Sequence, residues 1–321
     1  MGSLGQCETV LDQPQGVEVV PAGGEQSQQK ARESRRMALL RRAGLFGTDT
    51  KGAVIRRAIS VEDLAAAYRL VHDAFVERGY IPPQPTGLRL RVTEALPQTA
   101  TFIAEVGPEV VGVQSIAVDS DEFGLPSDGA FRNEIDSLRI GGRRVCEATN
   151  QAIAVDYRKT AVPTELMRCM FAHALAIGCD ELITTVSPGH ARFFGLLGFE
   201  QISPVRSYST EYDDPVVVMR VNVYDLVERA ARAQEDQDDG ALFVRSRCLE
   251  DNPYRGQVND WAAEAAKTFV DPAALHSLFV DQGNLLRSCS AEELAAICRQ
   301  WGHEVFDQVC GVEQMADLAV A

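Results

Sequence analysis

Glu147 is the residue of this sequence whose position most clearly suggests chemistry. It lies inside the stretch Val145–Val155, which is otherwise uncharged and whose pattern predicts a strand. An unpaired carboxylate is costly to bury, so Glu147 needs either a function or a cationic partner. A partly buried carboxylate can take a proton from a substrate, whereas an ion pair with Arg139 or Arg144 would be structural. The residues alone leave both roles open.

The cysteines predict neither a metal centre nor a nucleophilic thiol. The eight cysteines include no Cys-x-x-Cys pair, and a zinc site usually shows at least one tight ligand pair. Small buried thiols in a reduced compartment are the simpler interpretation. Cys146 adjoins Glu147, but neighbours on a strand point to opposite faces. Motifs of serine hydrolases, phosphate loops and dinucleotide-binding sites are also absent from the sequence.

The composition excludes several classes of protein. The chain has 321 residues, of which 31 are basic and 46 acidic, giving a net charge of −15. Such a charge does not suit binding to nucleic acid or to anionic lipid. No stretch approaches the roughly 18 apolar residues of a membrane helix, and the first 30 residues contain no signal-peptide core. We therefore expect a soluble cytoplasmic protein.

The sequence pattern divides the chain into three regions. Residues 1–52 lack sustained periodicity and predict a flexible tail. Residues 53–222 alternate between strand and helix patterns and predict a mixed α/β domain. Residues 223–321 hold eight basic and eighteen acidic residues, a net of −10, and predict an acidic helical region. Its linker is expected at Ala233–Gly240.

The elements expected in the middle region follow from apolar periodicity, helix caps and turn residues. The predicted strands are Val54–Ile59, Thr101–Val106, Val110–Val118, Val145–Val155, Leu182–Val186 and Val216–Val223. The predicted helices are Val61–Arg78, Pro163–Ile177 and His190–Leu197. In the C-terminal region, one helix is expected to begin at Asp271-Pro272, and a capping box at Ser290 predicts another that runs to about Val309.

Four segments of the middle region resemble one family, in the right order. They are FVERGYIP (75–82), EFGLPSDGAFRNEIDSLR (122–139), RVCEATNQAIAVDYR (144–158) and HARFFGLLGF (190–199). Together these resemble the N-acyl amino acid synthases of the FeeM type, a branch of the GNAT acyltransferase superfamily related in fold to the acyl-homoserine-lactone (autoinducer) synthases. The resemblance implies a GNAT fold: a central mixed, splayed sheet flanked by helices, here with a C-terminal helical region added.

The resemblance also implies an activity and a set of site residues. It implies transfer of a long-chain fatty acyl group from acyl carrier protein to the α-amine of an amino acid, with acyl-phosphopantetheine as donor substrate and no bound cofactor. The family has a glutamate at the position of Glu147, which would deprotonate the amine. Acceptor binding is expected from Asn150, Arg139 and Thr149. Donor binding is expected from Ile153, Val155, Arg158 and Lys159.

Asn150 departs from the related autoinducer synthases, which usually have arginine there. Asparagine offers only neutral hydrogen bonds, so the identity of the acceptor stays open. Strict alternation would also place Glu147 and Asn150 on opposite faces of the strand. Both can serve one cleft only through a β-bulge. Such a bulge is typical of this strand in the superfamily, where it frees backbone N–H groups for the pantetheine and the thioester oxygen.

The loop Arg158–Pro163 favours a carrier-protein donor. Coenzyme-A-dependent GNAT proteins have a glycine-rich turn there that cradles a pyrophosphate, but this loop has no glycine and Pro163 has no N–H. A carrier protein brings only one phosphodiester. Because such a carrier is itself acidic, a local basic surface is required. The expected residues are Arg139, Arg143, Arg144, Arg158 and Lys159.

The leaving thiolate and two rival functions complete the expectations. Phe194 stands where many GNAT enzymes have a tyrosine that protonates the thiolate. Tyr208 or Tyr212 would replace it, or solvent would supply the proton. The rivals are an acetyl-CoA-dependent GNAT acetyltransferase and a non-catalytic acyl-carrier scaffold that acts through its C-terminal helices.

Overall fold

The computed structural model describes residues 38–42, 44–208, 215–236 and 238–318, with the backbone alone for 311–318. Its centre is an eight-stranded mixed sheet of order β1-β2-β3-β4-β5-β8-β6, with β7 paired to β8. Among these pairs β4 and β5 are parallel, and the others are antiparallel. The strands are β1 (Val54–Arg57), β2 (Ala100–Val106), β3 (Glu109–Val118), β4 (Val145–Ile153), β5 (Glu181–Val186), β6 (Glu200–Gln201), β7 (Arg206–Ser207) and β8 (Pro215–Asn222).

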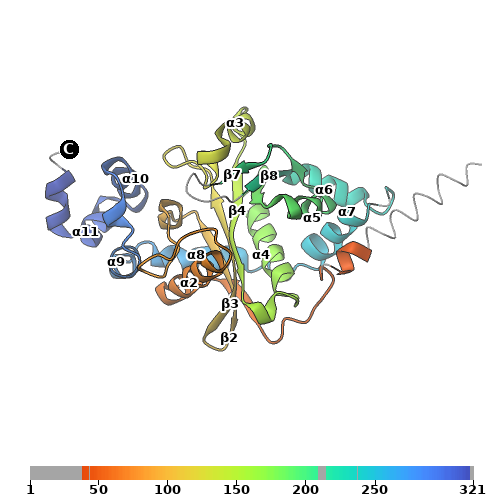
Figure 1. Ribbon diagram of the computed structural model, residues 1–321, viewed down its shortest axis with the longest axis horizontal. Helices are drawn as coiled ribbons and strands as arrows, with labels where there is room; N and C mark the ends of the chain where they lie inside the picture. Colours follow the sequence, from red (N-terminus) through yellow and green to blue (C-terminus); the bar gives the residue numbers. More distant parts are fainter. Residues whose placement is uncertain (1–37, 43, 209–214, 237, 319–321) are drawn as a thin grey trace, which may run out of the picture.

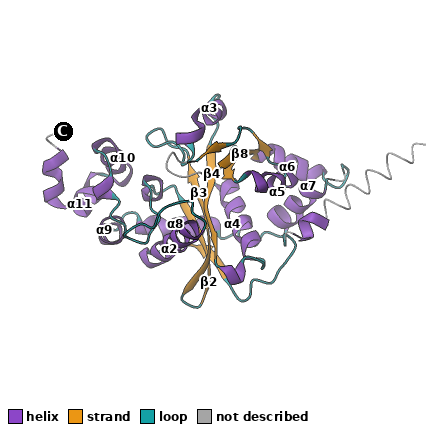
Figure 2. Ribbon diagram, in the orientation of Figure 1, coloured by secondary structure: helices purple, strands orange, loops and turns teal. Residues whose placement is uncertain are grey.

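Helices cover both faces of the sheet. Figures 1 and 2 show α2 and α9 to α11 on one side, α4 to α7 on the other, and α3 at one end of the strands. None of the described helices is long and apolar enough to cross a membrane. The helices are α2 (Val61–Glu77), α3 (Asp128–Arg139), α4 (Val162–Ala176), α5 (Pro188–Leu196), α6 (Val223–Arg232), α7 (Asp239–Phe243), α8 (Val258–Thr268), α9 (Pro272–His276), α10 (Ala291–Trp301) and α11 (His303–Leu318).

The mixed α/β fold predicted from the sequence is confirmed, and local sequence explains much of it. Ser60 and Asp63 form a capping box at the start of α2, whose residues Leu64, Tyr68 and Val71 are buried against the sheet. Gly107 supplies the turn between β2 and β3 with φ 58°. The short helical segments are η1 (Val92–Ala95), η2 (Val155–Tyr157), η3 (Val244–Glu250), η4 (Ser277–Gln282) and η5 (Leu286–Ser288).

Two expectations for the helices need correction. The helix expected from Ser290 to about Val309 is two helices, because Gly302 has φ 85° and ends α10 there. Helix α3 was not predicted, since its buried apolar residues are few: Phe131, Ile135 and Leu138.

The three regions of the sequence share two hydrophobic cores. Leu40 and Leu45, from the predicted tail, are buried in the cluster between the sheet and α4, and Phe243 of the C-terminal region joins them. On the other face, Phe279 and Trp301 pack in one cluster with α2. Residues 1–37 of the predicted tail lie outside the described part of the chain. The changes of sequence pattern at residues 52 and 223 are therefore not boundaries of packing.

Gly112 on β3 allows close packing of α4, and we expect its replacement to destabilise the fold. A Cβ atom there would lie 2.9 Å from Cγ1 of Val162 and 3.2 Å from Cβ of Ala104. Gly112→Val should lower the free energy of unfolding by about 1–3 kcal/mol through overpacking. Gly189→Val is the control, because nothing lies within 4 Å of that position. Equal midpoints of chemical denaturation for the two variants would contradict this account.

Candidate functional site

A bulge in β4 brings Glu147 and Asn150 to one site. On β3 one residue separates Val113 from Ser115, while two residues separate their partners on β4. Asn150 lies in the bulge and takes the left-handed conformation with φ 54°. The predicted bulge is confirmed. Nearby, β4 and β5 pair only as far as Ala148 and Thr184, so these two strands part at the bulge, while β4 stays paired with β3.

Glu147 is fully buried and is held by the start of α3. Its Oε2 accepts hydrogen bonds from the backbone N–H of Ser127, at 3.0 Å, and from Oγ of Ser127, at 2.8 Å. Burial raises the pKa of Glu147 to about 7, although the bonds from Ser127 oppose the shift. Near neutral pH the carboxyl can therefore take up or release a proton. The described contacts contain no ion pair between Glu147 and Arg139 or Arg144.

Beside Glu147, a guanidinium group stands against the bulge. Nη2 of Arg91 donates to Oε1 of Glu94, at 2.6 Å, and to Oδ1 of Asn150, at 3.2 Å. Nδ2 of Asn150 donates to the same oxygen of Glu94, at 2.9 Å. Burial would raise the pKa of Glu94, but Arg91 outweighs it and holds that pKa below its usual range. These three side chains fix one another, and Nη2 of Arg91 also lies 3.4 Å from Oγ1 of Thr149.

Arg89 and Tyr208 complete the group. Arg89 lies over the ring of Phe75, 4.9 Å from its centroid, and burial lowers the pKa of Arg89 to about 10. Oη of Tyr208 donates to the carbonyl of Pro126 at 2.8 Å, and burial raises its pKa to about 12. We call the following residues the polar cluster: Arg89, Arg91, Glu94, Ser127, Glu147, Thr149, Asn150 and Tyr208.

Arg139, expected to bind the acceptor, has all its donors occupied. Its five N–H groups meet the carboxylates of Asp119, Asp128 and Asp136 at distances from 2.6 to 3.0 Å. The arginine thus joins the end of β3 to α3 and leaves no donor for a substrate. Its place in the structure is to hold α3, whose preceding residue is Ser127.

The residues expected to bind the donor are not gathered beside Glu147. Ile153 is 8% exposed and belongs to the core under α4, whereas Val155 is 65% exposed. Arg158 pairs with Glu77 at 2.8 Å, and Lys159 is exposed. Both follow the end of β4, beyond the opening between β4 and β5.

The basic surface expected for an acidic carrier does not form. Three of its residues precede β4 and two follow it. Because β4 has nine residues, and a strand rises about 3.3 Å per residue, the two groups are on the order of 30 Å apart. The correction concerns Arg139, Arg143 and Arg144 on one side, and Arg158 and Lys159 on the other.

The loop after β4 offers few free amides to a phosphate. The N–H of Ala161 donates to the carbonyl of Asp49 at 2.8 Å, and that of Thr160 donates to Tyr157 at 3.1 Å. The N–H of Val162 donates to Oγ1 of Thr160 at 3.2 Å. A loop that satisfies its own donors in this way is not arranged to cradle a pyrophosphate.

A separate cleft of about 920 Å³ lies at the end of the sheet where β3 finishes and β4 begins. It is lined by Arg57 and His173, and by Asp128 and Arg139 from the network that holds α3. Burial lowers the pKa of His173 to about 3. Glu147 does not line this cleft, so we do not place the reaction there.

Ser127→Ala tests how Glu147 is tuned. Loss of the Oγ donor removes a contact that favours the charged carboxylate, so the pKa of Glu147 should rise further above about 7. The rising limb of a pH–rate profile should then move to higher pH. Ser137→Ala, on the exposed face of α3, is the control because its Oγ donates to the carbonyl of Glu134 on the same helix and lies away from the polar cluster. An unmoved profile for Ser127→Ala would contradict the assignment.

Sequence reasoning missed most of the polar cluster. Arg89, Arg91 and Glu94 lie in a segment with no clear helix or strand period, and Ser127 precedes a helix that was not predicted. The available signal was the run Arg89-Leu90-Arg91, in which two charges alternate with an apolar residue just before the predicted strand at residue 101. Tyr208 was considered as an acid, while Tyr212 lies outside the described residues. Phe194 packs against Phe199.

In comparisons with known proteins, residues 66–222 match the family model of the N-acyl amino acid synthase FeeM. The solved structure of FeeM, an N-acyl amino acid synthase from uncultured soil microbes, is 24% identical, with a TM-score of 0.50, covering 57% of this chain and 97% of that one. A CoA-dependent acyl-homoserine lactone synthase, BjaI, is 19% identical, with a TM-score of 0.42, covering 67% and 100%. No curated protein matches the sequence. The likeness to FeeM shows a common fold.

Proposed function

We propose that this N-acyltransferase, whose residues 66–222 belong to the FeeM family of N-acyl amino acid synthases, moves a long-chain fatty acyl group from acyl carrier protein to the α-amine of an amino acid. The resemblance predicted from the sequence is confirmed for the family and for the GNAT fold. In this proposal residues 53–222 form the acyltransferase domain and residues 223–321 a helical region that supports it.

The observation that carries the proposal is the state of Glu147. A buried carboxyl with a pKa of about 7 is partly ionised at neutral pH and can accept a proton. The amine of an amino acid is protonated at that pH and must lose a proton before it attacks. Glu147 takes that proton, the amine nitrogen bonds to the thioester carbonyl carbon, and the C–S bond breaks to release the pantetheine thiolate. The nitrogen then loses a second proton, which passes through solvent to the thiolate, so the products are an amide and the free pantetheine thiol. The proton on Glu147 also leaves through solvent.

The opening between β4 and β5 suits the acyl donor. The strands part after Ala148 and Thr184, so the thioester can approach the bulge beside Glu147. Backbone N–H groups of the bulge would hold the developing oxyanion. Val155, which is exposed, would flank the pantetheine arm, and Arg158 and Lys159 would meet its phosphate.

The hydrogen bonds of the backbone amides after β4 support the carrier protein as donor. A coenzyme A donor brings a pyrophosphate, and the amides of Thr160, Ala161 and Val162 already have partners within the protein. Charge gives the carrier no support, because the expected basic surface is divided. The described cysteines are free thiols, which suits the reduced cytoplasm.

The test offers the purified protein three donors separately: palmitoyl acyl carrier protein, palmitoyl-CoA and acetyl-CoA. Each is incubated with a mixture of the twenty amino acids, and products are identified by mass spectrometry. We expect N-palmitoyl amino acids from the carrier protein and little product from either CoA ester. Faster turnover of palmitoyl-CoA would overturn the donor assignment, and N-acetyl products would favour the acetyltransferase. Carrier binding without any amide product would favour a scaffold.

A further inference from the structure

Three buried polar atoms of the polar cluster lack a hydrogen-bond partner among the described residues. They are Nε of Arg89, Nη1 of Arg91 and Oε1 of Glu147. Buried polar atoms are normally paired, and leaving one unpaired is costly. Both arginines lie close enough to Glu147 to feel its charge. Two unpaired donors and one unpaired acceptor therefore lie in the same small region.

This set of atoms matches the charges of an α-amino acid. Such a molecule carries a carboxylate, which accepts hydrogen bonds, and an ammonium, which donates them, on one carbon atom. We infer that Arg91, assisted by Arg89, binds the carboxylate of the acceptor while Oε1 of Glu147 receives its amine. The inference rests on the proposed function and assigns the residues by which this chain would distinguish an amino acid from an amine or an amide.

The contacts of Arg91 explain why it is the arginine that binds the carboxylate. Glu94 and Asn150 occupy its Nη2 and leave Nη1 free. Glu94 and Asn150 act as positioning residues, because they fix the plane of the guanidinium group and do not bond to Nη1. Asn150 itself has its Nδ2 occupied by Glu94. The cationic charge that asparagine lacks at the bulge is thus supplied from another segment of the chain.

The charge balance also favours an anionic group. Arg89 and Arg91 bring two positive charges, and Glu94 neutralises one of them. When Glu147 holds its proton, the cluster has one positive charge in excess. A carboxylate compensates that charge, and an uncharged acceptor does not.

The experiment compares matched acceptors. With the amino acid that is acylated fastest, kcat/KM is measured beside that of its primary amide and of the amine that lacks the carboxyl group. The wild type should prefer the amino acid by about 10- to 100-fold, as expected of charge-assisted hydrogen bonds. Arg91→Gln should raise KM for the amino acid by a similar factor and leave the amide unaffected, so that the preference disappears.

Controls separate binding from folding. Arg56→Gln removes an arginine that is paired with Asp63 and Glu105 outside the polar cluster, and it should keep the preference. If Arg91→Gln does not fold because Glu94 loses its partner, the pair Arg91→Gln with Glu94→Gln removes both charges and should lose the preference too. Equal rates for the amino acid and its amide in the wild type would overturn the inference alone. Absence of product from any acceptor would overturn the proposed function as well.

Discussion

Glu147→Gln is expected to lower kcat by about 10²- to 10⁴-fold, the usual contribution of general base catalysis. Glutamine has nearly the same shape and can still accept the hydrogen bonds from Ser127 through its carbonyl oxygen, so the site should keep its form. What it cannot do is take the proton of the amine. KM for the amino acid should change little, since Arg91 is unaltered. The measurement is steady-state acyl transfer with circular dichroism to verify folding.

The pH dependence provides a second measurement on the same residue. Because the pKa of Glu147 is about 7 in the folded protein, the rate should rise with pH through that value as the base loses its proton. The wild-type profile should show this limb and Glu147→Gln should not. Glu200→Gln is the control, since Glu200 is exposed and pairs with Arg220 on β8. A variant at Glu147 with unchanged turnover would falsify the assignment.

Stability should respond to pH in the opposite direction. The folded-state pKa is raised above the ordinary value of 4.5, so the unfolded chain loses this proton before the folded protein does. The contribution of Glu147 to the free energy of unfolding is full below about pH 4.5 and is lost as pH rises to about 7. The loss is on the order of 3 kcal/mol. Glu147→Gln should lack it and be at least as stable as the wild type at pH 8.

Trp301→Ala is expected to have the largest effect on stability, a loss of about 3–5 kcal/mol. The side chain is 5% exposed and packs against Phe279 and Phe306. Its Nε1 also donates to the carbonyl of Ala95 at 2.7 Å. Truncation leaves a large cavity and an unpaired carbonyl beside η1. Chemical denaturation, followed by fluorescence or circular dichroism, measures the loss.

Two variants separate the parts of this effect. Trp301→Phe keeps most of the apolar contact but loses the hydrogen bond to Ala95, which should cost about 1 kcal/mol. Because Ala95 adjoins Glu94, we also expect a higher KM for the amino acid in that variant. Trp261→Ala, at a partly buried tryptophan in the other core cluster, should leave this KM unchanged. A wild-type KM in Trp301→Phe would show that η1 does not depend on the tryptophan.

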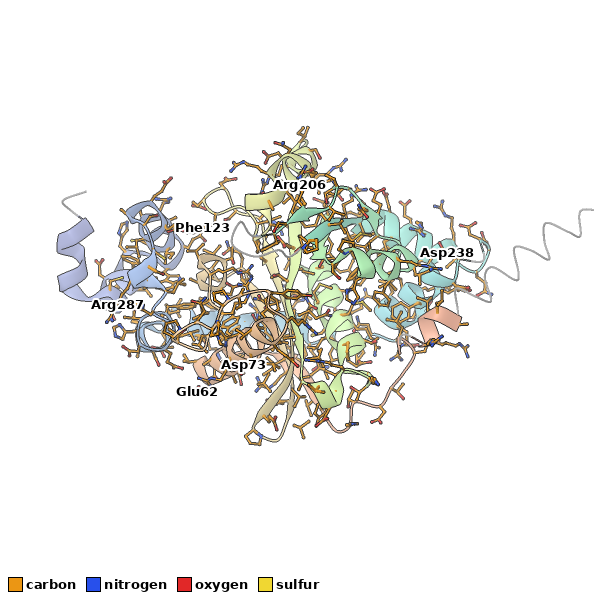
Figure 3. All side chains as sticks on the ribbon, in the orientation of Figure 1. Glu62, Asp73, Phe123, Arg206, Asp238 and Arg287 are labelled. Carbon is orange, nitrogen blue, oxygen red and sulfur yellow. The ribbon has the colours of Figure 1, made fainter. Side chains whose placement is uncertain are left out.

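The sequence was most informative where local signals agree with packing. The caps at Ser60 and Ser290 predicted the starts of α2 and α10, and Pro163 and Gly178 predicted α4 close to its observed bounds. Helix α3 was missed because contacts with other elements stabilise it: Arg139 binds Asp119 at the end of β3, and Arg206 on β7 binds Glu134 of the helix. Figure 3 shows Arg206 below α3, and Phe123 toward the C-terminal helices.

Of the candidate site, only the part on β4 was predictable from the sequence. Glu147 is visible as a charge within an apolar strand, and the bulge followed from the family resemblance. Arg91 could not be found this way, because the segment 89–94 has no pattern that assigns it to β4. What brings them together is a set of hydrogen bonds between residues 56 or more positions apart. Arg139 shows the reverse. The family resemblance suggested a substrate contact, but two aspartates of its own helix, Asp128 and Asp136, and Asp119 at the end of β3 occupy all its donors.

Helix α10 contacts two of the segments that carry the polar cluster. Trp301 holds the segment that follows Arg91 and Glu94, while Arg299 and Gln300 approach Glu122, in the loop that leads to Ser127. The contact between Trp301 and Ala95 spans 206 positions of the chain. During synthesis the strands and Glu147 leave the ribosome long before α10 does. A nascent chain is thus expected to contain Glu147 well before α10 is present to hold the segment of Arg91 and Glu94 in place.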